Sequence, residues 1–153
     1  MKQPENLQDL RKILYHYGVR NIPILGVSVS TMVHEYGHLI CSKALGFNGF
    51  IKSEALTSVY HSTKPIGFQW KVFYLSGGLL QFLVFLLMSL KADDYGAKIA
   101  DRMTALIGLV EGLVEPFRFF RLTGLGASLG IIFAFIYLAI EVYRVQAVES
   151  SSK

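Results

Sequence analysis

Two long uncharged stretches constrain the fold more than any other feature of the sequence. Residues 72–90 and 122–140 each run for 19 positions without Asp, Glu, Lys, Arg or His. A helix that crosses the hydrocarbon core of a bilayer needs about 20 predominantly apolar residues, so both stretches have the composition of a membrane span. Hydrophobic residues make up 52% of the 153-residue chain and charged residues only 17%. A domain of this size buries only about two-thirds of its surface, so a soluble bundle could not hide this much apolar area. We therefore expect an all-α integral membrane protein.

Two further stretches, 22–45 and 103–121, are apolar except for a few ionisable residues. These are His34, Glu35, His38 and Lys43 in the first stretch and Glu111, Glu115, Arg118 and the terminal Arg121 in the second. Together with the uncharged stretches they predict about four transmembrane helices with short connections. The longest polar connection, 46–71, alternates weakly and contains Pro65 and Gly67, so we expect a short β-ribbon between the first two spans.

The two ends of the chain differ from this apolar core. Residues 1–18 carry apolar side chains at helical spacing among polar ones, which predicts an amphipathic N-terminal segment; a frayed arm is the alternative. Residues 19–145 form the predicted membrane-embedded core, and residues 146–153 a polar tail. The net charge of +4 suits a protein beside anionic lipid. No basic cluster with interleaved aromatic residues indicates a nucleic-acid partner.

The motif His-Glu-Tyr-Gly-His at 34–38 is the sharpest chemical feature of the sequence. On a helix, His34 and His38 share one face at i and i+4, so both imidazoles can reach one zinc ion. Glu35 lies one residue round, where its carboxylate can take a proton from a zinc-bound water. Ionisable residues inside a span are costly and therefore indicate a functional site. The alternative is a polar cluster that only forms hydrogen bonds between helices.

Depth in the bilayer relates this motif to other polar residues. At 1.5 Å per residue, His34, Gln81 and Glu111 all lie near the middle of their predicted spans. Adjacent spans run antiparallel, so these three groups can meet in one layer near the bilayer centre. The sequence thus predicts a polar site built from several helices.

Three motifs resemble, in order, those of the site-2-protease family of intramembrane zinc metalloproteases. The first is His-Glu-Tyr-Gly-His-Leu-Ile at 34–40. The second is Ser-Gly-Gly-Leu-Leu-Gln at 76–81, which is similar to the family's Gly-Pro-x-x-Asn. The third is Val-Glu-Gly at 110–112, where the family has a Leu-Asp-Gly whose aspartate is the last zinc ligand. The resemblance covers residues 22–121.

In the second motif Gly77 matches the family, Gly78 replaces its proline and Gln81 replaces its asparagine. The resemblance implies that Gln81 donates a hydrogen bond to the substrate backbone or the developing oxyanion, and that Gly77 and Gly78 let a substrate strand or a neighbouring helix approach closely. The alternatives are a hydrogen bond between helices for Gln81 and simple helix packing for the two glycines. In the third motif Glu111 replaces the aspartate, so the implied zinc ligands are His34, His38 and Glu111.

The implied activity is hydrolysis of peptide bonds in or near transmembrane segments of membrane proteins. Zn²⁺ is the expected cofactor, and Glu35 is the expected general base acting on zinc-activated water. We expect a multi-pass protein of the cell membrane, whose partners are the lipid bilayer and a membrane-protein substrate; the sequence is also compatible with a homo-oligomer. The alternatives are a catalytically inactive adaptor that binds transmembrane segments, and a metal transporter or regulator.

Other side chains compete with Glu111 for the place of the third ligand. Glu115 lies one helical turn further along the same face, next to Pro116, with Arg118 at i+3 able to neutralise it. Cys41 shares a face with His34 at i+7, although a cysteine in an apolar helix is more often a packing residue. The remaining candidates, in an expected surface loop, are Asp93, Asp94 and Asp101.

Overall fold

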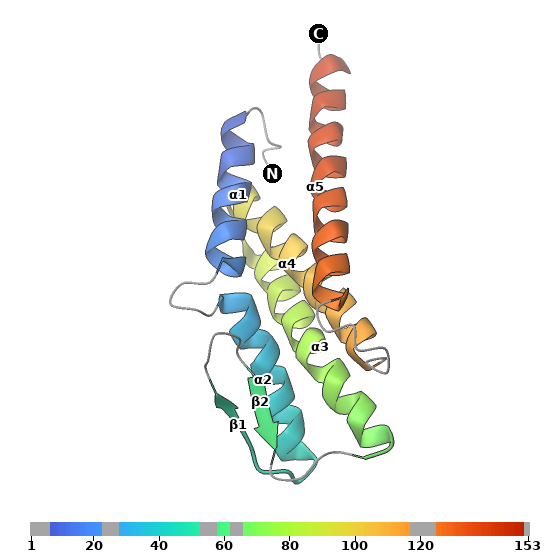
Figure 1. Ribbon diagram of the computed structural model, residues 1–153. Helices are drawn as coiled ribbons and strands as arrows, with labels where there is room; N and C mark the ends of the chain where they lie inside the picture. The colour runs from blue at the N-terminus through green and yellow to red at the C-terminus, as the bar shows by residue number, and fades with distance from the viewer. Residues whose placement is uncertain (1–6, 23–27, 53–57, 62–65, 117–124, 152–153) are drawn as a thin grey trace.

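The computed structural model describes residues 7–22, 28–52, 58–61, 66–116 and 125–151 as a helical bundle with one small ribbon (Figure 1). Its elements are α1 (Leu7–Asn21), α2 (Val29–Ala44), β1 (Gly49–Lys52), β2 (Ser58–His61), α3 (Phe68–Lys91), α4 (Tyr95–Val114) and α5 (Leu125–Ser151). Helix α4 is central, because it packs against α1, α3 and α5, while α2 packs against α3. The chemistry-bearing motifs of α2, α3 and α4 therefore meet inside the bundle.

Helices α3 and α5 contain the two uncharged stretches. Within the described part of the chain, α3 and the 125–144 segment of α5 are the two helices long and apolar enough to cross a membrane. Large apolar side chains stay exposed on both, including Leu83 and Leu87 on α3 and Phe133 on α5. Soluble monomers rarely expose continuous apolar surfaces of this extent, so the outer faces of α3 and α5 fit a lipid environment. The other two predicted spans have no such support from length and composition.

Helix α1 packs along α4 and α5 instead of standing apart from the core. Its Ile13 is only 3% exposed and belongs to one apolar cluster with Ile99 and Met103 of α4 and Leu138 of α5. The apolar spacing predicted for the N-terminal segment is thus used to dock a helix onto the bundle. Helix α5 continues to Ser151, so most of the predicted polar tail is helical.

The surface loop predicted to hold Asp93, Asp94 and Asp101 is shorter than expected: Asp93 and Asp94 lie at an exposed turn, but the placement of Asp101 there is wrong. Helix α4 already begins at Tyr95, because the Asp94 side chain accepts a hydrogen bond from the Ala97 N–H at 2.8 Å and caps the helix. Asp101, expected in that loop, is 1% exposed inside α4 and pairs with the Arg20 guanidinium of α1. The charge of Asp101 is balanced by a residue 81 positions away, which no local pattern reveals.

Helix α2 is shorter than the predicted span of residues 22–45. It begins at Val29, because the Ser28 hydroxyl accepts a hydrogen bond from the Thr31 N–H at 3.1 Å and caps its first turn. With 16 residues the helix is about 24 Å long. His34 therefore lies in the second turn of a short helix, close to its N-terminal end. Residues 23–27 lie outside the described residues.

The connection between α2 and α3 contains the two strands. Gly46 ends α2 with a positive φ of 81°, a conformation that favours glycine. Strands β1 and β2 then pair antiparallel, with Gly49 opposite His61 and Lys52 opposite Ser58. This small sheet contacts α2 and lies at one end of the bundle (Figure 1).

The ion pair between α1 and α4 gives the first testable prediction. Replacing Arg20 with Met leaves the Asp101 carboxylate buried without its cation, which costs about 3 kcal/mol. We expect Arg20→Met to lower the thermal unfolding midpoint in detergent micelles. The exposed Arg11 of the same helix provides the control, since Arg11→Met should change little. The double variant Arg20→Met/Asp101→Leu should recover part of the loss; equal stability of Arg20→Met and wild type would contradict the assignment.

Candidate metal centre

The two histidines of the first motif point at the same place from one face of α2. Their i and i+4 spacing brings the two Nε2 atoms to 3.1 Å from each other, as the helical periodicity predicts. Both side chains are buried, His34 with 7% and His38 with 5% of its surface exposed. The imidazoles thus form half of a potential coordination shell inside the bundle.

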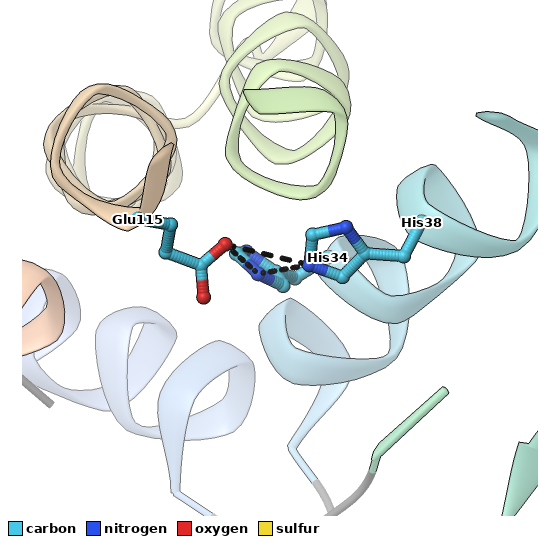
Figure 2. A group of neighbouring side chains, drawn as sticks. All are labelled: His34, His38 and Glu115. Atoms are coloured by element: carbon cyan, nitrogen blue, oxygen red, sulfur yellow. Dashed lines mark hydrogen bonds and ion pairs between the residues drawn. The ribbon is translucent and has the colours of Figure 1, made fainter. Parts of the chain in front are cut away.

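Glu115, at the C-terminal end of α4, completes a group of three donor atoms. Figure 2 shows its carboxylate reaching from α4 toward the imidazoles of α2. Its Oε2 lies 3.4 Å from Nε2 of His34 and 3.4 Å from Nε2 of His38. Ligand atoms placed at 2.0–2.1 Å around a tetrahedral ion are about 3.3–3.4 Å apart. The three atoms therefore have nearly the spacing of one face of a tetrahedral coordination shell.

The polar atoms at this site also fit a cation. Within the described part of the chain, the buried Oε2 of Glu115 and Nδ1 of His34 have no hydrogen-bond partner. Burying such atoms without compensation is costly, and a divalent ion bound by Glu115 supplies that compensation for the carboxylate. Two imidazoles and one carboxylate are a donor set found in catalytic zinc sites that keep an open position, and other transition metals also bind imidazole. The group of His34, His38 and Glu115 can therefore hold a metal ion.

A backbone carbonyl of α3 orients the second imidazole. The Nδ1 atom of His38 lies 2.8 Å from the carbonyl oxygen of Phe73, which also accepts a hydrogen bond from Ser76. An acceptor at this position requires the proton on Nδ1, so the lone pair of Nε2 is left to face the site. Sequence analysis did not identify Phe73, because its contribution comes from the main chain.

Two glycines allow α2 and α3 to approach closely beside the metal-binding group. A Cβ atom on Gly77 would lie 2.5 Å from Nε2 of His38 and 2.7 Å from Nε2 of His34. On the α2 side, a Cβ atom on Gly37 would lie 2.9 Å from the Cα atom of Gly77. Any larger side chain at either position would displace the imidazoles or separate the helices.

Gly78, the other glycine of the second motif, faces away from this group. A Cβ atom there would collide with the backbone of Gly108 and Gly112 in α4. Neither Gly77 nor Gly78 is among the described residues that line the cavity beside the site. Their contacts in this structure are those of close helix packing, and a contact with substrate stays a prediction.

A cavity of about 270 Å³ lies beside the metal-binding group. His34, Glu35, Glu111 and Glu115 line it, so three carboxylates face one cavity. No Lys or Arg is found among its described lining residues. A cavity with this balance of charge attracts cations and provides room for water next to the metal-binding group.

Hydroxyl groups line another part of this cavity. Ser28 is the N-cap residue of α2, Ser30 and Thr31 lie in its first turn, and Tyr17 comes from α1, whose last residue, Asn21, adds an amide. Sequence analysis did not identify them, although the run Ser-Val-Ser-Thr at 28–31, just before the histidine motif, is an unusually polar start for an apolar helix. They make the approach to the site polar.

Gln81 also lines the cavity, where it is 2% exposed. One of its amide N–H groups donates a hydrogen bond to the carbonyl oxygen of Thr104 in α4 at 3.2 Å. His34, Gln81 and Glu111 thus lie around one cavity, whereas their predicted depth near the bilayer centre stays a prediction. The contact of Gln81 with substrate stays a prediction.

The structure separates the two glutamates that compete for the third ligand position. Glu115 shares the metal-binding group with the imidazoles, whereas the nearest contact of Glu111 is between its Oε2 and Nδ1 of His34, at 3.5 Å. The geometry therefore favours Glu115 over Glu111. Arg118, expected to neutralise Glu115, lies outside the described residues.

The remaining candidate ligands lie elsewhere. Cys41 is a free, half-buried cysteine outside the metal-binding group. Asp93 and Asp94 lie at the exposed turn between α3 and α4, and Asp101 is paired with Arg20. None of these four side chains belongs to the group formed by the described histidines and Glu115.

Removal of the third donor gives the second prediction. Wild-type protein should bind one equivalent of Zn²⁺. Glu115→Gln should weaken zinc affinity more than 100-fold, because the loss of a metal ligand lowers affinity more than the loss of an outer-shell partner, which costs 10- to 100-fold. Competition with a chromophoric chelator in detergent measures both. The exposed Asp93→Asn variant is the control and should bind as wild type does. Unchanged affinity in Glu115→Gln would exclude this ligand set.

The close approach of α3 gives the third prediction. A methyl group at position 77 would occupy space beside both Nε2 atoms, so Gly77→Ala should lower zinc affinity at least tenfold while circular dichroism shows retained helix content. The control is Gly18→Ala in α1, where the new Cβ meets only the flexible end of Ile22, at 3.3 Å. Wild-type affinity in Gly77→Ala would show that the imidazoles are not held against α3.

The chain matches no protein-family model, no curated protein and no solved structure. The resemblance to the site-2-protease family is carried by the three motifs and stays a prediction.

Proposed function

We propose that this protein is an intramembrane zinc metalloprotease, similar to site-2 proteases, that hydrolyses peptide bonds in or near transmembrane segments. One observation carries the proposal. Three donor atoms from His34, His38 and Glu115 have the mutual spacing of tetrahedral zinc ligands, and Glu35 lines the adjoining cavity. A metal-binding group alone fits many proteins, whereas a carboxylate beside its first histidine suits hydrolysis.

The chemical role of each residue at the site follows from the atoms that it donates to the metal or to the cavity. Zinc, when bound by His34, His38 and Glu115, polarises a carbonyl group and lowers the pKa of water to about 7. Glu35 lines the same cavity as His34, so its carboxylate can accept the proton of the attacking water and return it to the departing amine. General base catalysis of this kind contributes typically 10²- to 10⁴-fold to the rate.

The membrane setting is part of the proposal. We infer that α2 and α4 lie in the bilayer together with the two apolar helices α3 and α5, which gives four membrane-embedded helices. Hydrolysis at that depth requires water, and polar groups at membrane depth are tolerated where they line a water-filled cavity. The hydroxyl-bearing residues Ser28, Ser30 and Thr31 line the cavity beside the metal-binding group, which suits it to hold water. These residues support a polar route between the site and the aqueous phase.

The substrate class follows from the same setting. A peptide bond inside a helix has its carbonyl oxygen engaged in a backbone hydrogen bond, so the segment must unwind before that oxygen can meet the metal. Gln81 retains a second amide hydrogen beyond the one donated to Thr104, and it lines the cavity. We therefore assign Gln81 a contact with the unwound substrate backbone.

The fourth prediction tests catalysis separately from metal binding. Zinc-loaded protein in liposomes is mixed with a panel of single-span model peptides labelled at both ends, and cleavage is followed by mass spectrometry. We expect wild-type protein to cleave at least one peptide, and Glu35→Gln to lose 10²-fold or more of the rate while it retains one equivalent of zinc. The control Asp93→Asn should cleave as wild type does.

Two outcomes would overturn the proposal in different ways. Zinc retention with capture of the peptides but no cleavage by wild-type protein would identify a membrane adaptor. Cleavage by Glu35→Gln at the wild-type rate would show that the proton is handled elsewhere or that a contaminating protease acts.

A further inference from the structure

The sequence Gly-Leu-Val-Glu occurs twice in succession in α4, at 108–111 and 112–115. A four-residue period on a helix places the two glycines on one face and the two glutamates on another. The glycines face α3, because a Cβ atom on Gly108 would lie 2.8 Å from the Cβ atom of Gln81, and one on Gly112 would lie 3.1 Å from the Leu75 carbonyl oxygen. The repeat thus brings α4 close to α3 while both glutamates face α2.

The two glutamates contact the two nitrogens of a single imidazole ring. Oε2 of Glu115 lies 3.4 Å from Nε2 of His34, and Oε2 of Glu111 lies 3.5 Å from Nδ1 of the same ring. Glu115 therefore belongs to the metal-binding group, and Glu111 lies on the other side of the His34 ring. The helical period of the repeat generates this arrangement.

The Nδ1 atom of His34 needs an acceptor. It is buried and has no hydrogen-bond partner among the described residues, whereas the corresponding Nδ1 atom of His38 lies 2.8 Å from the Phe73 carbonyl oxygen. Histidines that bind a metal through Nε2 almost always donate the other N–H to a carboxylate, a carbonyl or water. Glu111 is the carboxylate in reach, and a movement of about 0.5 Å brings its oxygen into hydrogen-bonding distance.

We propose that Glu111 is a positioning residue that accepts the Nδ1–H of His34, while Glu115 is the metal ligand. The carboxylate of Glu111 then fixes the tautomer and the ring orientation of His34, so that the lone pair of Nε2 faces the metal. Each imidazole of the site has its own acceptor, a side chain of α4 for His34 and the main chain of α3 for His38. This assignment rests on the metal centre of the proposed function but not on proteolysis.

The test compares substitutions of the two glutamates by zinc affinity and by the visible absorption spectrum of the Co²⁺-substituted protein. In Glu111→Gln the amide oxygen still accepts the Nδ1–H, so we expect affinity within about tenfold of wild type. Glu111→Leu has a similar size but no acceptor and should lose 10- to 100-fold. In both variants the Co²⁺ bands should keep their wild-type positions, because the ligand atoms are unchanged. In Glu115→Gln the affinity should fall more than 100-fold and the bands should move.

Several results would overturn this assignment. If Glu111→Gln lost zinc as completely as Glu115→Gln, or if it shifted the Co²⁺ bands, Glu111 would be identified as a metal ligand. Glu111→Leu that binds zinc as wild type does would show that the carboxylate has no positioning role. Circular dichroism shows whether Glu111→Leu folds. If it does not, the comparison of the zinc affinities of Glu111→Gln and Glu115→Gln still shows which glutamate is the ligand. Because these measurements need no substrate, a protein that binds zinc in the expected order but cleaves nothing refutes proteolysis alone.

Discussion

The close approach of α2 to α3 at Gly37 and Gly77 is the contact on which the rest of the site depends. Without Cβ atoms the two backbones lie near enough for the His38 ring to reach the Phe73 carbonyl, and both imidazoles pack directly against Gly77. Van der Waals packing is the main force that holds apolar helices together in a bilayer, and small residues allow it. The packing of the bundle and the orientation of the two imidazoles that could bind a metal are thus produced by the same residues.

Sequence patterns reveal the parts of this fold that depend on local chemistry. The uncharged runs predict α3 and the N-terminal part of α5 up to Ile140, and the i, i+4 histidines predict a shared face of α2. The start of α2 was missed because it depends on one Ser28 hydroxyl, and the start of α4 because the charge of Asp101 is balanced by Arg20 in a distant helix. Composition indicates which residues favour lipid or helix, but it does not show which charged groups are paired across the bundle.

The third donor illustrates the same limit within the site. Glu111 and Glu115 are chemically identical and share one face of α4, so neither residue type nor periodicity can rank them. The choice depends on where the end of α4 lies relative to α2, and α3 sets that position through Gly78, which contacts the backbone of Gly108 and Gly112. A family motif that places its acid at position 111 selects the helix and the face, whereas the geometry of the donor atoms favours the acid one turn further on, at Glu115.

The position of Glu115 at the very end of α4 has a consequence for the stability of the whole protein. Helix α2 packs on α3 and the small sheet, and α4 packs on α1, α3 and α5, so an ion held by His34, His38 and Glu115 would add a direct link between α2 and α4. Because an unfolded chain lacks this arrangement of donors, free zinc would favour the folded form by mass action. The bound ion would then act as a reversible cross-link, and the free energy of unfolding would rise with the concentration of free ion around the membrane.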